Sequence, residues 1–153
     1  MALNEGVCRL GNWSVRVLWE GELVHTVAFC DLPPAGEVPE PIAAYCRGEP
    51  ADLSSLRLPA LDRPGKSAEV YREVRAVPYG TTTTYGTIGR RIGTSARAVG
   101  QAMRRNPTPL VVPCHRVIGS DGSILGFTPS VAIKEYLLAL EQGRSVKRTG
   151  AKL

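Results

Sequence analysis

The chain has 153 residues, enough for one domain or for a small domain beside a larger one. No apolar stretch approaches the roughly 20 residues that a membrane-spanning helix needs, and the N-terminus "MALNEGVCRL" has no basic region followed by an apolar core, so we expect neither a membrane span nor a signal peptide. The net charge of +5 hides an asymmetry, because residues 1–62 carry a net of −5 and residues 63–116 a net of +8.

The basic region contains no acidic residue between Glu73 and Asp121, yet it holds seven arginines. A solvated surface usually mixes its charges, so this pattern favours a polyanionic partner. The alternative is a chance cluster of solvated arginines.

The first part of the chain predicts a small sheet and a helix. The run "WSVRVLW" alternates, "EGE" offers a turn and "LVHTVAF" resumes a β-rich run, so we expect an antiparallel sheet within residues 5–30. The proline-rich loop "DLPPAGEVPEP" follows, and then a short helix near Ile42–Arg47. We place a boundary near residues 60–66.

The next part predicts short helices. Val70, Val74 and Val77 share one helical face. The run "TTTTYGTIGRRIG" predicts a threonine-capped helix that ends at Gly93, and "TSARAVGQAMRRN" begins another with a fresh cap. Two short helices joined by a glycine-containing turn are typical of a helix-turn-helix.

The second of these helices carries small side chains at Ala96, Ala98, Gly100 and Ala102. They let the backbone approach a partner closely. Either another helix or a nucleic-acid groove is compatible with that pattern, and the interleaved arginines favour the groove.

The segment "NPTPLVVPC" has three prolines in seven residues and predicts an extended chain without helix. The run "SVAIKEYLLALEQG" predicts the last helix, with Ile133, Leu137 and Leu140 on one face and Gly143 as its C-cap.

The expected fold class is α+β. A small antiparallel sheet-plus-helix domain at residues 1–62 precedes an all-helical domain with a helix-turn-helix at residues 63–143 and a basic tail at 144–153.

One cysteine stands beside a base, in "VVPCHRVIG". A buried cysteine is inert unless its thiolate is stabilised, and His115 directly follows Cys114. Adjacent side chains point to opposite faces in an extended segment, so the pair works only if the chain turns there or a water bridges the two groups. Glu141 lies where the helix dipole disfavours its charge, which suggests a Cys–His–Glu relay. The alternative is an ordinary surface glutamate.

The segments "VPYGTTTTYGTIG", "ARAVGQAMRRNP" and "PLVVPCHRVIG" resemble the O6-alkylguanine-DNA alkyltransferase family. The similarity covers roughly residues 67–142, and the first 60 residues resemble the family only in layout. The resemblance implies repair by direct reversal, in which an alkyl group passes irreversibly from guanine O6, and in some cases thymine O4, to a cysteine.

The resemblance also assigns catalytic roles. It implies that Cys114 accepts the alkyl group, that His115 takes the thiol proton through a water, and that Glu141 is hydrogen-bonded to that histidine. Asn106 matches the asparagine that braces the helix-turn-helix against the cysteine segment. Tyr85 matches the tyrosine that helps rotate the nucleotide and donates a proton toward guanine N3.

The implied partner is double-stranded DNA with its alkylated base flipped out, bound through the minor groove. Arg97 matches the arginine that fills the gap in the duplex. Small and basic residues of the same helix, Ala96, Gly100 and Arg104, are expected to contact the DNA.

The alkylated base is expected to meet three further residues. Val117 matches the position whose backbone carbonyl reads the guanine amino group. In "GFTPSVA", Phe127 replaces a tyrosine and Thr128 a serine of many family members; Phe127 can still form an apolar wall and Thr128 can still donate its backbone N–H. Pro129 and Ser130 replace two glycines, which stiffens the loop and affects the range of alkyl groups accepted.

We expect no metal and no cofactor. Cys8, His25 and Cys30 could converge in the small sheet, but their spacing fits no standard zinc site and no fourth ligand is evident. A Cys8–Cys30 disulfide is the other alternative, although reduced thiols are the default in the cytoplasmic, monomeric protein that we expect.

Two other functions compete with the alkyl acceptor. An alkyltransferase-like protein would bind the lesion without transfer, but such proteins lack the acceptor that Cys114 supplies here. A cysteine hydrolase would need an oxyanion hole and a path for water, which "NPTPLVVPC" does not visibly offer.

Overall fold

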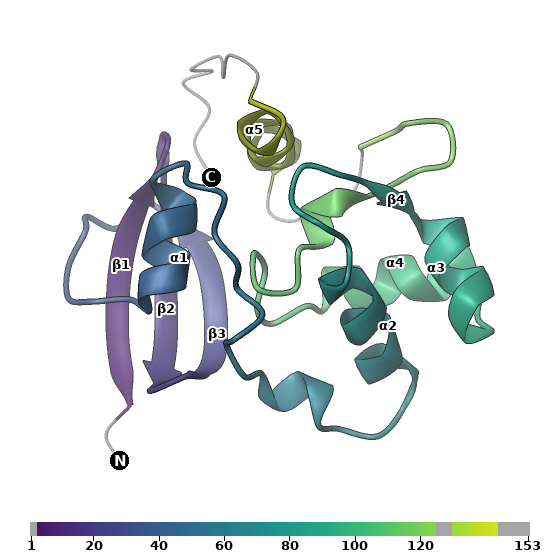
Figure 1. Ribbon diagram of the computed structural model, residues 1–153, viewed down its shortest axis with the longest axis horizontal. Helices are drawn as coiled ribbons and strands as arrows, with labels where there is room; N and C mark the ends of the chain where they lie inside the picture. Colours follow the sequence, from purple (N-terminus) through teal and green to yellow (C-terminus); the bar gives the residue numbers. More distant parts are fainter. Residues whose placement is uncertain (1–2, 125–129, 144–153) are drawn as a thin grey trace.

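The computed structural model describes residues 3–124 and 130–143 (Figure 1). Three strands form an antiparallel sheet in the order β1-β2-β3: β1 (Asn4–Leu10), β2 (Trp13–Glu20) and β3 (Leu23–Cys30). The predicted sheet within residues 5–30 is confirmed. It has one strand more, β1, than the two β-rich runs that the sequence distinguished.

The sheet is covered on one side by α1 (Glu40–Cys46). The helix begins slightly before the predicted Ile42–Arg47 because Pro41 falls in its first turn, where a missing N–H is tolerated. Its buried face carries Ile42, Tyr45 and Cys46. Through this face, α1 directs these three side chains toward the rest of the molecule.

The chain then crosses over through a short 3₁₀ turn (Pro59–Leu61) to α2 (Lys66–Arg75). Arg75, at the end of α2, donates from Nη2 to the carbonyls of Leu53 and Leu56 in the crossing segment. A side chain of the helical part thus satisfies backbone acceptors of the connection.

Two short helices follow, α3 (Tyr85–Ile92) and α4 (Ala96–Arg104), capped by the hydroxyls of Thr84 and Ser95 as predicted. Gly93 ends α3 with φ +73°, a left-handed conformation that suits glycine. A Cβ at Gly89 would lie 2.6 Å from the Thr94 carbonyl oxygen, so only glycine lets the turn fold this tightly against α3.

The prediction that the second part is all-helical is wrong. Two short strands, β4 (Thr83–Thr84) and β5 (Val117–Ile118), pair in parallel there, Thr83 opposite Val117 and Thr84 opposite Ile118. Strands of two residues are too short to show an alternating pattern, which is why the sequence gives no sign of them. Their pairing places the start of α3 beside the segment that follows Cys114.

The last helix, α5 (Val131–Glu141), is capped by the Ser130 hydroxyl. Ile133 and Leu137 are fully buried and Leu140 packs on them, which confirms the predicted apolar face. Gly143 has φ +68°, as expected just after a helix.

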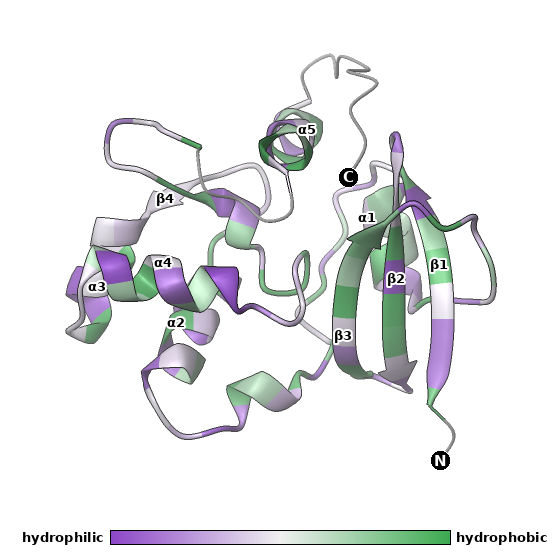
Figure 2. Cartoon of the chain, turned by 180° about the vertical axis from the view of Figure 1, so that it is seen from behind, coloured by the Kyte–Doolittle hydropathy of each residue, from purple (hydrophilic) through white to green (hydrophobic). Residues whose placement is uncertain are grey.

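One hydrophobic cluster runs through both parts, from Trp13 and Val15 of the sheet to Ile133 and Leu137 of α5. Figure 2 shows the hydrophobic residues of β2 and β3, and the alternation of polar and apolar residues along α4. Tyr136 of α5 packs edge-on against Trp13, with ring centroids 5.5 Å apart. Among the helices in the described ranges, none is long and apolar enough to cross a membrane.

Candidate active site

Cys114 begins a 3₁₀ turn, Cys114–Arg116, directly after the proline-rich segment. The segment contains no helix up to Pro113, as predicted, but the chain does turn at the cysteine itself. The turn meets the condition for Cys114 and His115 to work together. The thiol is nearly enclosed, since Cys114 is 7% exposed.

Asn106 braces this segment through its side-chain amide. Its Nδ2 donates to the Val112 carbonyl (2.9 Å) and its Oδ1 accepts from the Thr108 N–H (3.0 Å). A side-chain hydrogen bond from Asn106 also favours the thiolate form of Cys114. Because Asn106 follows α4, it links the end of that helix to the cysteine segment.

His115 and Glu141 form a buried pair, 0% and 8% exposed. Nε2 of His115 lies 2.5 Å from Oε2 of Glu141. A carboxylate can only accept hydrogen bonds, so Nε2 carries the proton and Nδ1 of a neutral imidazole is left as the basic nitrogen. Nδ1 is buried and has no hydrogen-bond partner among the described residues.

Glu141 is held by three further groups that the sequence did not reveal. Arg116 forms a two-point contact, Nε to Oε1 at 2.8 Å and Nη2 to Oε2 at 3.0 Å. The Gly80 N–H donates to Oε1 (3.1 Å), and the Tyr45 hydroxyl donates to Oε2 (2.5 Å). These donors explain how a carboxylate can remain at a helix C-terminus in the interior.

The pKa shifts agree with a neutral histidine beside an ionised glutamate. Burial lowers the pKa of His115, and Glu141 offsets this only in part. Burial alone would raise the pKa of Glu141, but hydrogen bonds from His115 and Arg116 outweigh it and hold that pKa well below its usual range. Burial raises the pKa of the Cys114 thiol, opposed by Asn106 and by the positive charge of Lys134.

Lys134 is a functional candidate that the sequence analysis missed. It is 0% exposed, and its Nζ donates to the Val117 carbonyl (2.7 Å). The signal was present, because Lys134 lies seven positions before Glu141, two helical turns away on the same face, next to the buried Ile133. A lysine on the apolar face of an amphipathic helix needs a buried partner.

Tyr85, the first residue of α3, lies half-buried near Lys134, whose Nζ is 5.8 Å from the centre of its ring. Burial raises the pKa of Tyr85, and a negative charge on Cys114 would raise it further. The Tyr85 hydroxyl therefore keeps its proton at neutral pH. The β4–β5 pairing positions this tyrosine beside the cysteine turn.

The residues expected to contact DNA share the outer side of α4. Ala96, Arg97 and Arg104 are exposed and Gly100 is partly exposed. A Cβ at Gly100 would meet no atom within 4 Å, so this glycine leaves open space rather than making room for a neighbouring helix. Ala102 is buried and belongs to the core instead.

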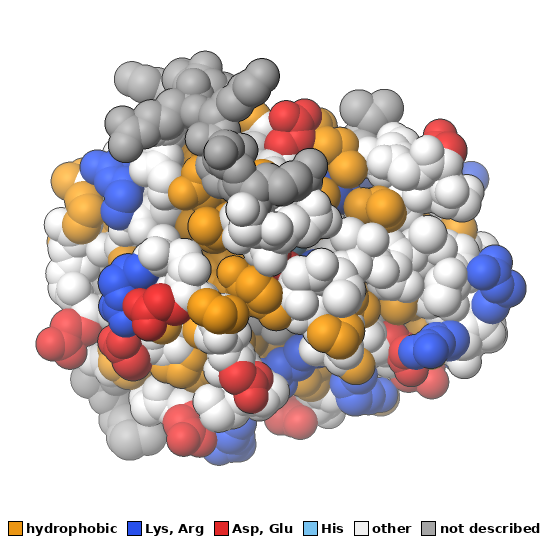
Figure 3. Space-filling view, turned by 45° about the horizontal axis from the view of Figure 1, so that its top comes forward, with side chains coloured by type: hydrophobic (Ala, Val, Ile, Leu, Met, Phe, Trp, Pro, Cys, Tyr) orange, Lys and Arg blue, Asp and Glu red, His pale blue; other side chains and the backbone are white. Residues whose placement is uncertain are grey.

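Counting all seven arginines of the acid-free region as a polyanion surface is wrong. Arg116 is 8% exposed and bound to Glu141, and Arg75 is bound to backbone carbonyls. The exposed members are Arg90, Arg91, Arg97, Arg104 and Arg105. In Figure 3, most acidic side chains of the face shown gather on the sheet side, whereas Lys and Arg side chains occur on both sides, including the opposite edge.

The structure places Val117 directly after the cysteine turn, buried, with its carbonyl accepting from Lys134. The other two expected base contacts, Phe127 and Thr128, lie outside the described residues, as do Pro129 and the tail at 144–153.

The alternatives for Cys8, His25 and Cys30 do not hold. Cys8 is opposite Val15 of β2 and Cys30 is opposite Ser14, so β2 separates the two cysteines and their Cα atoms are about 9–10 Å apart, too far for a disulfide. His25 instead lies 3.0 Å from a Glu20 oxygen. Within the described ranges, no three His, Cys, Asp or Glu side chains form a group that could hold a metal ion.

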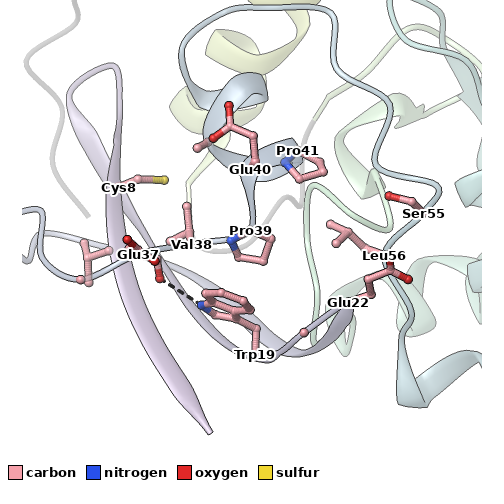
Figure 4. A pocket seen from close by; sticks show the side chains of 14 residues that line it. Cys8, Trp19, Glu22, Glu37, Val38, Pro39, Glu40, Pro41, Ser55 and Leu56 are labelled. Atoms are coloured by element: carbon pink, nitrogen blue, oxygen red, sulfur yellow. Dashed lines mark hydrogen bonds between the residues drawn. The ribbon is translucent and has the colours of Figure 1, made fainter.

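A groove in the N-terminal part is separate from this site (Figure 4). Trp19 lies along it and donates from Nε1 to the Glu37 carbonyl (3.0 Å), with Pro39 and Glu40 nearby. None of the catalytic candidates lines it. The groove therefore contributes no residue to the site at Cys114.

Comparison with known proteins supports the same region. The family described as "6-O-methylguanine DNA methyltransferase, DNA binding domain" matches residues 66–143. The chain is 43% identical over 104 residues to a "DNA base-flipping protein" of Thermus thermophilus, covering 68% of this chain and 71% of that protein. It is 41% identical over 107 residues to a "Methylated-DNA--protein-cysteine methyltransferase" of Methanosarcina acetivorans, covering 69% and 67%.

Among solved structures, the chain is similar to the Mycobacterium tuberculosis protein OGT in complex with DNA. The TM-score is 0.75 at 27% identity, covering 93% of this chain and 94% of that one. This likeness extends to the N-terminal part, whose sequence identified nothing by itself.

Proposed function

The chain belongs to the 6-O-methylguanine DNA methyltransferase family, and we propose that it repairs DNA by moving an alkyl group from guanine O6 to Cys114. The protein is a methylated-DNA–protein-cysteine methyltransferase that acts once. The observation that carries this function is the nearly enclosed Cys114 thiol beside a buried histidine–glutamate pair. Transfer to thymine O4 lesions is the same chemistry at a second base.

The reaction exchanges one proton for one alkyl group. The Cys114 sulfur attacks the alkyl carbon, the S–C bond forms and the C–O6 bond breaks. The thiol proton passes to Nδ1 of His115 through a water, and the departing guanine takes a proton at N3 from Tyr85, which regains one from His115 through solvent. Exchange with solvent then moves the guanine proton from N3 to N1. The products are a thioether and an unmodified guanine.

A base is needed because the resting thiol keeps its proton. Burial raises the pKa of Cys114, while the lowered pKa of His115 keeps the imidazole neutral and able to accept. Lys134 and Asn106 then stabilise the thiolate that forms. An alkyl thioether does not hydrolyse in water, so Cys114 stays blocked and each molecule makes a single transfer.

Binding is assigned to the two helices that precede the cysteine segment. We propose that α3 and α4 form a helix-turn-helix within a catalytic domain of residues 63–143, separate from a domain of residues 1–62. Arg97 and Arg104 would contact DNA along the minor groove, with Ala96 and Gly100 allowing close approach. Arg97 would fill the gap that the flipped nucleotide leaves, since chemistry on a base edge requires the base to leave the stack.

Val117 is proposed to read the flipped guanine. A carbonyl oxygen has two lone pairs, and Lys134 uses one of them. The other can accept from the guanine amino group. Lys134 would thus both orient this carbonyl and lie near the reacting sulfur.

Lesion binding without transfer is not favoured. The Thermus relative is named for base flipping rather than methyl transfer, but a lesion-binding protein has no use for a thiol held beside a buried base. A hydrolase is also not favoured, because it would have to release the alkyl group from Cys114 again. A cytoplasmic monomer without metal or cofactor remains our prediction.

The test is incubation with a duplex that contains one O6-methylguanine, followed by intact-protein and peptide mass spectrometry. We expect one methyl group per chain, on the peptide that carries Cys114. Binding without an adduct would instead support the lesion-binding alternative, and repeated turnover without an adduct would support a hydrolase.

A further inference from the structure

A phenol from the N-terminal part reaches the catalytic pair. Tyr45, near the end of α1, is 1% exposed. Its hydroxyl donates to Oε2 of Glu141 at 2.5 Å and lies 3.3 Å from Nε2 of His115. Tyr45 is therefore the described side chain of the N-terminal part that touches both members of the pair.

Packing alone does not require this hydroxyl. The ring lies edge-on against Tyr79, with centroids 5.9 Å apart, and a phenylalanine would make the same contact. Burial and the negative charge of Glu141 raise the pKa of Tyr45, so the hydroxyl keeps its proton and remains a donor at neutral pH. It always presents its proton to the carboxylate and a lone pair toward the imidazole.

The hydroxyl is also not needed to keep Glu141 ionised. The two-point contact with Arg116 and the Gly80 N–H already stabilise the carboxylate. Tyr45 adds a hydroxyl that contacts both His115 and Glu141, so the three side chains are all in contact with one another. The Nε2–H of His115 faces one carboxylate oxygen and one phenol oxygen, so both the ring orientation and the position of its proton are defined.

We propose that Tyr45 is a positioning residue, which holds the His115 ring with its Nε2–H toward Glu141 and so leaves the basic Nδ1 free to act as the base for Cys114. The importance of this geometry for alkyl transfer rests on the function proposed above. The N-terminal part then completes the relay instead of serving only as a support for the catalytic part.

The test uses Tyr45→Phe, with Tyr79→Phe as the matched control. The control removes a hydroxyl from the neighbouring ring, and that hydroxyl makes no hydrogen bond to a described residue. Thermal unfolding of both variants shows whether each one folds as the unmodified protein does. The chain has only two histidines, so nitrogen NMR of ¹⁵N-histidine-labelled protein reports His115 directly, with His25 on β3 as an internal reference.

In the unmodified protein we expect the neutral His115 signal of a ring protonated on Nε2. In Tyr45→Phe we expect Nε2 to keep its proton, since Glu141 still accepts it, but its nitrogen signal to shift because the phenol oxygen is gone. We also expect a raised His115 pKa, because the carboxylate charge is then shared with one donor fewer. The single-turnover rate should fall about tenfold, which corresponds to the free energy of one lost hydrogen bond to a charged group. Tyr79→Phe should resemble the unmodified protein in all three readouts.

A His115 spectrum unchanged in Tyr45→Phe, or a rate within about twofold of the unmodified protein, would overturn the proposal. The NMR readout needs no substrate. If the unmodified protein forms no alkyl adduct, the proposed function fails, and the spectra still decide whether Tyr45 positions His115.

Discussion

On the outer side of α4, Arg97 and Arg104 are exposed and make no ion pair with any residue that the structure describes. At the cysteine turn the opposite holds, since Arg116, Glu141 and His115 are all buried and both Arg116 and His115 are bound to Glu141. Exposed charges act at long range and are screened by salt, while buried ones act through geometry and proton position. DNA binding by α4 should therefore depend on ionic strength. Transfer at the cysteine turn should depend instead on pH and on the placement of side chains.

We expect Cys114→Ser to show the largest difference between transfer at the cysteine turn and DNA binding by α4. Transfer should be abolished, because no other strong nucleophile lies in the turn, while affinity for alkylated duplex should remain near that of the unmodified protein. Titration against labelled duplex measures transfer, and a mobility-shift assay measures binding. Cys30→Ser, which changes a cysteine on β3, is the control and should transfer normally. Residual transfer by Cys114→Ser would contradict the assignment of the acceptor.

The buried pair should act as a unit. We expect His115→Ala to lower the single-turnover rate at saturating DNA by about a hundredfold, in the range of general-base catalysis. The double variant His115→Ala, Glu141→Gln should lose little more, because Glu141 acts through His115. If the two single losses simply add in free energy, Glu141 does not work through the histidine.

The exposed arginines should control the salt dependence of binding. Replacing Arg97 and Arg104 by alanine should weaken binding and reduce the slope of log K against log salt by about 2, one for each positive charge removed from the DNA interface. The variant Arg9→Ala, Arg57→Ala removes the same charge from exposed positions of the N-terminal part and should leave the slope unchanged. Equal slopes in the two variants would mean that only net charge matters.

The smallest expected effect is on the pH profile of transfer. Because burial lowers the pKa of His115 below its ordinary 6.5, the rate at saturating DNA should stay level as the pH falls to about 6.5 and decline only below it. The same shift means that the folded chain binds fewer protons than the unfolded chain, so the stability that His115 contributes is present above about pH 6.5 and lost as the pH falls. A decline in rate that begins above pH 7 would show that His115 is not a neutral base in the resting protein.

Sequence reasoning found the site residues that a local motif or an unusual local position marks. Cys114 and His115 are adjacent, and Glu141 stands out because the helix dipole disfavours it, whereas the role of Asn106, eight residues before Cys114, came from the resemblance to the family. The structure brings all four together. Such motifs are readable because the chemistry fixes both residue type and spacing.

The residues that sequence reasoning missed are positioned by tertiary contacts. Tyr45 lies 96 residues before Glu141, and nothing in the α1 sequence indicates which partner its hydroxyl meets. Arg116 resembled the other arginines of the acid-free region, and only its burial distinguishes it. Local sequence gives residue type and periodicity, but a contact between distant segments depends on how the two parts pack.

The most direct test of this division is single-turnover transfer measured over a range of DNA concentrations, at low and moderate salt. For Arg104→Ala, we predict that the rate returns to that of the unmodified protein once the DNA is saturating, and that the required concentration rises with salt. For His115→Ala, we predict a rate that stays low at every DNA concentration and at both salt levels. The account would be contradicted if the arginine variant stayed slow at saturation, or if more DNA restored the histidine variant.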